Sequence, residues 1–218
     1  MAAGKGRPRT PISFACVAVC ALAAPLAVAA AAAGQGSAVC PPASSVPPAP
    51  SSSPPSVVAC VGSREVTLAS FEHWSEVAKA AEAAHPPSAH ELIEQVMGFL
   101  LSAEWVRGEA RARHVHVRRA TVRRKFERLR KQQFHKLAQF RAFLRKSKET
   151  VADLLMRVEL QLLAAAIQKR VTAGKRGPKA QARALGRFVE RFAKRWKART
   201  YCASAYAVAD CGHVQEAL

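Results

Sequence analysis

Apolar side chains that return every three or four residues, between residues 67 and 199, constrain the fold of this chain more than any other feature. This spacing is the period of an amphipathic helix. The first such run carries Phe71 and Trp74, and Pro86-Pro87 ends it, because proline cannot continue a helix. Glycine and proline form no repeat, which excludes a collagen-like chain. We therefore predict a mainly all-α domain built as a helical bundle.

Start and stop signals divide this region into separate helices. Ser88 and Glu91 form an S-x-x-E capping box for a helix expected to run to about Arg113. Thr150 with Asp153 makes a second start of this kind. The remaining helices are marked by Val122, Phe126 and Leu129, by Phe140, Phe143 and Leu144, and by Leu185, Phe188, Val189, Phe192 and Trp196.

Two short segments have a different pattern. The apolar run at 57–61 precedes a Gly62-Ser63-Arg64 turn, so we predict a brief strand pair or extended segment near 57–66. Thr67 then caps the first helix. The tail that follows residue 200 alternates like a short hairpin or strand.

The N-terminal region is typical of an exported protein. Lys5, Arg7 and Arg9 precede a stretch without charge, from residue 11 to residue 33, that ends in small residues. This pattern predicts a signal peptide or a membrane anchor over 1–34. Residues 35–56 carry seven prolines and no charge, as in a semi-rigid linker. Both readings of 1–34 make the domain at 57–218 extracytoplasmic, either secreted or anchored at the cell surface.

Four cysteines follow the predicted signal or anchor: Cys40, Cys60, Cys202 and Cys211. In an oxidising compartment their thiols tend to pair. Cys202 and Cys211 flank an eight-residue segment that can double back, so we predict a disulfide between them. Spacing alone does not decide whether Cys40 pairs with Cys60.

Positive charge dominates the chain and is segregated along it. Lysine and arginine total 34 against 15 acidic residues, which gives a net charge of +19. Residues 107–148 hold sixteen bases and two acids, residues 169–199 hold twelve and one, and residues 58–106 hold two bases and seven acids. An exported protein seldom meets nucleic acid, so we expect no nucleic-acid partner. The simpler interpretation is a solvated basic face, and the alternative is attraction to an anionic wall polymer, a lipid surface or an acidic polypeptide.

No residue pattern predicts catalysis, a cofactor or a metal site. Gly174-Lys175 lacks the frame of a phosphate-binding loop. His114 and His116 have no third ligand close in sequence, and their neighbours Arg118 and Arg119 would repel a cation.

Several blocks, taken in order, resemble SurA-like and PrsA-like extracytoplasmic chaperones. They are VVACVGSREVTLASFEHWSEVAKAA, ELIEQVMGFLLSAEWVRGEARARHVHV, FERLRKQQF, FRAFLRKSKETVADLLMRVELQLL and FVERFAKRWKARTYCASAYAVADC. The resemblance covers about 57–211. It implies a helical module of the SurA N-terminal type, which a C-terminal helix completes.

The sequence departs from this family at one place. Relatives usually insert a parvulin-type prolyl isomerase domain before the last helix, whereas here 171–181 is the whole connection. So short a segment cannot form a β-rich domain with its own core.

The resemblance implies a chaperone that holds unfolded or exported polypeptides without isomerising prolines. Two other functions stay open: a peptidyl-prolyl isomerase-type foldase, and a basic adaptor at a cell wall or membrane surface. We expect most of the large apolar side chains to be ordinary core. The candidates for client binding among them are Phe71, Trp74, Met97, Phe99, Phe140, Phe143, Met156, Phe192 and Trp196.

Overall fold

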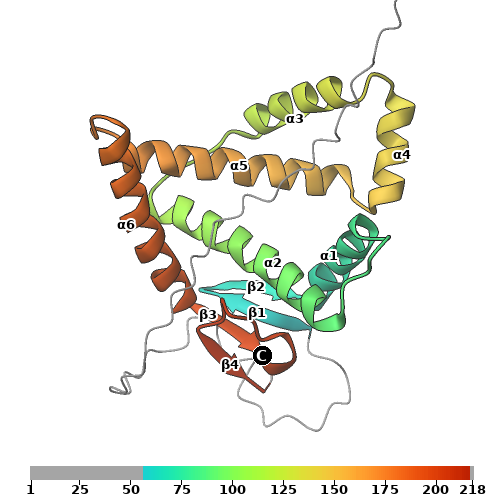
Figure 1. Ribbon diagram of the computed structural model, residues 1–218, viewed down its shortest axis with the longest axis horizontal. Coiled ribbons are helices and arrows are strands. Elements are labelled where there is room, and N and C mark those ends of the chain that lie inside the picture. Colours follow the sequence, from blue (N-terminus) through green and yellow to red (C-terminus); the bar gives the residue numbers. More distant parts are fainter. Residues whose placement is uncertain (1–55, 217–218) are drawn as a thin grey trace, which may run out of the picture. The chain divides into compact units, whose positions relative to one another are not determined.

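The computed structural model describes residues 56–216, so the predicted signal or anchor and nearly all of the predicted linker lie outside the described residues. Within 56–216 the chain is mainly helical with one small sheet, as predicted (Figure 1). The elements in order are β1 (Val57–Val61), β2 (Arg64–Thr67), α1 (Leu68–Ala81), α2 (Ala89–Ala112), α3 (Arg119–Gln133), α4 (Leu137–Ser147), α5 (Val151–Thr172), α6 (Pro178–Lys197), β3 (Thr200–Ala203), a 3-10 turn η1 (Ser204–Tyr206) and β4 (His213–Gln215).

The predicted helix starts are confirmed. The Thr67 hydroxyl accepts a hydrogen bond from the Ser70 amide at 3.2 Å. Both capping boxes form, at Ser88 for α2 and at Thr150 for α5. By contrast, the N-cap residue of α3, Arg118, makes no side-chain cap, because arginine has no acceptor to offer the free backbone amides.

The sheet joins the two ends of the domain. Its strand order is β2-β1-β3-β4, with β1 antiparallel to both neighbours and β3 parallel to β4. Ala59 of β1 stands opposite Cys202 of β3. Of the two forms expected for the tail, the strand is therefore confirmed and the hairpin is wrong, because β3 and β4 pair in parallel, whereas the strands of a hairpin are antiparallel.

The main core lies between this sheet, α1, α2 and the end of α6. Val58, Met97 and Leu101 have no exposed surface. Burying such side chains contributes about 1.5–3 kcal/mol each to stability. In Figure 1, α2 runs between the sheet and α5, so one face of α2 completes this core and the other supports α5.

Helices α3, α4 and α5, residues 119–172, form a second unit of packing that we call the arm. The arm has its own apolar cluster, in which Val122, Phe126, Phe140, Leu154 and Val158 are buried. It contacts the rest of the domain through α5, which packs against α2 and α6, and through α4, which approaches α1.

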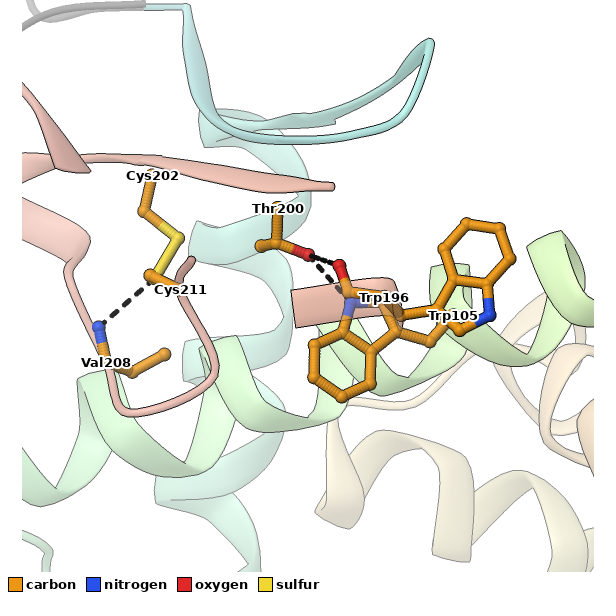
Figure 2. Close-up of a disulfide and its surroundings, with 6 residues drawn as sticks. All are labelled: Trp105, Trp196, Thr200, Cys202, Val208 and Cys211. Atoms are coloured by element: carbon orange, nitrogen blue, oxygen red, sulfur yellow. Dashed lines mark hydrogen bonds between the residues drawn. A yellow bond between two sulfur atoms is a disulfide. The ribbon is translucent and has the colours of Figure 1, made fainter. Parts of the chain in front are cut away.

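Helix α6 is fixed to α2 near its C-terminal end. The Trp196 ring fills the space above Gly108, where an added Cβ would come within 2.1 Å of the ring. The Trp105 indole donates to the buried Thr200 hydroxyl at 2.8 Å, and that hydroxyl donates to the Trp196 carbonyl at 2.8 Å (Figure 2). Two tryptophans and one threonine thereby join α2, α6 and β3.

The predicted disulfide is present and closes the tail. Cys202 and Cys211 are bonded with their Cα atoms 5.9 Å apart, and the Val208 amide donates to the Cys211 sulfur at 3.3 Å (Figure 2). Cys60 is also disulfide-bonded, and Cys40 lies outside the described residues.

We expect Gly108→Ala to lower the free energy of unfolding by about 1–3 kcal/mol or more, because the new methyl group displaces the Trp196 ring. Urea denaturation of the full chain measures this. The matched control is Gly98→Ala in the same helix, where the added Cβ meets nothing within 4 Å. There the better helix propensity of alanine should raise stability by up to about 1 kcal/mol. Equal effects of the two variants would contradict the packing described.

Removal of the tail disulfide should also destabilise the domain. The bond joins residues nine apart, and the loss of so small a closed loop costs about 2–3 kcal/mol on the chain-entropy model. Urea denaturation of the Cys202→Ala/Cys211→Ala double variant measures the difference. An unchanged free energy of unfolding would show that the tail is held by its strand pairing alone.

Candidate functional site

The nine candidates for client binding fall into two groups, one in the core and one half-buried. Trp74, Met97, Phe140 and Trp196 are at most 7% exposed. They fill the apolar cores, so a client does not reach them in this conformation. The other five are half-buried: Phe71, Phe99, Phe143, Met156 and Phe192.

The half-buried group does not form one surface. Phe71, Phe99 and Met156 border the main core, while Phe143 belongs to the arm. Phe192 of α6 also borders the main core, where its ring centroid is 6.0 Å from that of Trp105. The sequence therefore identified side chains at the edges of two different cores.

In the apolar cluster of the arm, half-buried side chains outnumber buried ones. The cluster holds five buried members and seven half-buried ones, which are Val117, Leu129, Phe134, Phe143, Leu144, Leu155 and Leu162. Leu137, the first residue of α4, is 52% exposed. Of the arm, sequence reasoning named Phe140, Phe143 and Met156 as client-binding candidates, and Met156 packs against the main core. The available signal was that three amphipathic helices bury only the faces they turn toward one another.

A stacked arginine joins the arm to the main core. The guanidinium of Arg157 on α5 lies 5.0 Å from the Trp74 ring centroid and 5.4 Å from that of Phe99. Glu149 pairs with Arg157 at 3.1 Å. Burial raises the pKa of Glu149, and the charge of Arg157 only partly offsets this effect.

The most buried charge in the described part of the chain is Glu109 of α2, which is 1% exposed. Its carboxylate accepts a hydrogen bond from the Trp196 indole at 2.9 Å. It also forms ion pairs with Arg113, one turn along α2, and with Arg195 of α6. Glu109 therefore satisfies three donors at the place where α6 crosses α2.

The pKa of Glu109 reflects a balance of opposing effects. Burial of the carboxyl by itself raises the pKa. The hydrogen bonds from Trp196 and Arg113 and the charges of Arg195 and Arg113 outweigh burial, so the pKa lies below its ordinary value. Glu109 is thus ionised at neutral pH and holds Arg113 in a defined position.

Metal binding and membrane crossing find no support in residues 56–216. No group of three His, Cys, Asp or Glu side chains there could hold a metal ion. Among the same residues, every helix is too short or too polar to cross a bilayer.

No protein-family model, curated protein or solved structure matches this chain. The resemblance to SurA-like and PrsA-like chaperones therefore stays a prediction from the sequence.

Replacement of Glu109 by glutamine should lower the free energy of unfolding by about 2–3 kcal/mol at pH 7, because two arginines lose a buried partner. Urea denaturation measures the change. Glu127→Gln is the matched control, since that glutamate is half-exposed and pairs with Arg130 within α3. There the expected loss is about 0.5 kcal/mol or less.

Comparison of wild type with Glu109→Gln at several pH values tests the lowered pKa of Glu109. A carboxyl whose folded pKa is depressed stabilises the fold above its unfolded pKa of about 4.3, and this contribution is lost as the pH falls toward the folded pKa. The stability difference between wild type and Glu109→Gln should therefore be constant from pH 7 to about 5 and shrink below that. A difference that grows as the pH falls from 7 to 5 would indicate a raised pKa and contradict the assignment.

Proposed function

We propose that this protein is an extracytoplasmic holdase, a chaperone that binds unfolded or exported polypeptides without folding them. The carrying observation is the apolar cluster of the arm, where half-buried members outnumber buried ones by seven to five. Apolar surface that a fold leaves partly exposed is available to apolar side chains of another chain.

The charge around this surface supports the proposal. Residues 107–148 include sixteen bases and two acids. Strong like charge keeps such a surface from associating with copies of itself, while flexible unfolded chains can still approach it. An exposed apolar surface is thereby compatible with solubility.

The direct link between α5 and α6 argues for holding without isomerisation. Residues 173–177 alone separate the end of α5 from the start of α6. A catalytic domain with its own core does not fit into this turn. The export features of the N-terminus and the disulfide Cys202–Cys211 support an extracytoplasmic site of action.

The proposal is tested by aggregation suppression with the full chain and an unfolded client at comparable concentration. We expect suppression that persists at high salt, because apolar contacts are not screened. Leu137→Gln/Phe143→Gln should reduce suppression several-fold, because Leu137 is 52% exposed and Phe143 is half-buried at the edge of the arm cluster.

The matched control is Val214→Gln on β4, where Val214 is 55% exposed against 52% for Leu137. It removes a similarly exposed apolar side chain outside the arm and should leave suppression unchanged. No suppression by wild type, or equal losses in the arm and control variants, would overturn the proposal.

A further inference from the structure

A basic hollow lies where the end of α2, the end of α5 and the middle of α6 meet. Its volume is about 290 Å³. Five cationic side chains line it: Arg113, Arg170, Lys175, Arg187 and Arg191. Three apolar residues complete the lining, and none of the lining residues is acidic.

The positive charge of this hollow is largely unbalanced. Of its five cations, only Arg113 has an ion-pair partner among residues 56–216, namely Glu109. The surrounding segment 169–199 contains twelve bases and one acid. Five cations around one small hollow repel one another, so an anion that enters it relieves a cost already present in the fold.

Helix dipoles do not account for this convergence. Arg170 and Lys175 lie at or just beyond the end of α5, where the helix C-terminus favours positive charge. Arg187 and Arg191 lie in the middle of α6, one turn apart, where the dipole favours neither sign. These two arginines face the same hollow as the other three cations.

One arginine of the hollow is held in place before any ligand arrives. Glu109 pairs with Arg113, and the Arg113 guanidinium lies 4.8 Å from the centroid of the Phe188 ring in the same lining. A side chain fixed in this way loses little freedom when it binds a ligand.

We propose that this hollow binds a phosphate-bearing anion. Guanidinium groups match phosphate oxygens with paired hydrogen bonds, and clustered arginines favour a group with more than one negative charge. The volume suits a phosphate or pyrophosphate group and is at the low end for larger ligands. This site is separate from the apolar surface of the arm and goes beyond the proposed holdase function.

The primary test is calorimetric titration of the full chain with inorganic pyrophosphate at fixed ionic strength. We expect saturable binding with one site, and a pyrophosphate-dependent rise in the melting temperature. Arg187→Gln/Arg191→Gln should weaken binding at least tenfold, because it removes two of the five cations.

Two further variants separate a built site from diffuse attraction. Arg123→Gln/Arg124→Gln removes the same charge from exposed positions on α3, outside the hollow, and should leave binding nearly unchanged. Arg187→Lys/Arg191→Lys keeps the charge but loses the paired hydrogen bonds, and should bind with intermediate affinity. Circular dichroism without ligand checks that all variants fold. The proposal would be overturned if wild type showed no saturable pyrophosphate binding, or if both glutamine variants weakened that binding equally.

Vesicles distinguish the possible sources of the phosphate group. We compare vesicles of phosphatidylcholine alone with vesicles that also contain phosphatidic acid. Binding to phosphatidic acid that only the Arg187→Gln/Arg191→Gln variant loses would assign the phosphate to a lipid headgroup. Pyrophosphate binding without vesicle binding would assign it to a soluble or polymer-borne phosphate. Both results support the site.

Discussion

The buried carboxylate of Glu109 is the interaction on which the arrangement of the helices depends. It is 1% exposed and meets donors from both α2 and α6. An ionised group at this depth is tolerated only when it is fully paired, so the two helices have one relative position that satisfies it. That position sets the Trp196 ring over Gly108, brings β3 beside β1, and holds Arg113 at the edge of the basic hollow.

Local features of the fold could be predicted from sequence, because their causes lie within a few residues. The capping boxes at Ser88 and Thr150 are satisfied by side chains three positions away. The pairing of β1 with β3 could not be predicted, because no local sequence pattern near Ala59 indicates that Cys202 is its partner. The turn before α6 is also a local feature, because Gly174, Gly177 and Pro178 interrupt the helical spacing there.

The candidate sites show the same difference between local features, which the sequence predicts, and long-range contacts, which it does not. Helical spacing placed Trp74, Phe99 and Phe143 on the apolar faces of their helices. It does not show which of these side chains neighbouring helices cover. Charge counts revealed the excess of bases in 169–199. They did not reveal that Arg113, far away in sequence, joins Arg187 and Arg191 around one hollow.

The order of strands in the sheet has a consequence for how the molecule is made. The central strand β1 is synthesised first in the domain, yet one of its partners, β3, follows all six helices. Such a pairing between distant segments gives a high contact order and delays the closure of the sheet. A chain synthesised N-terminus first can complete the arm early, but the main core and the Cys202–Cys211 bond must wait for its last residues.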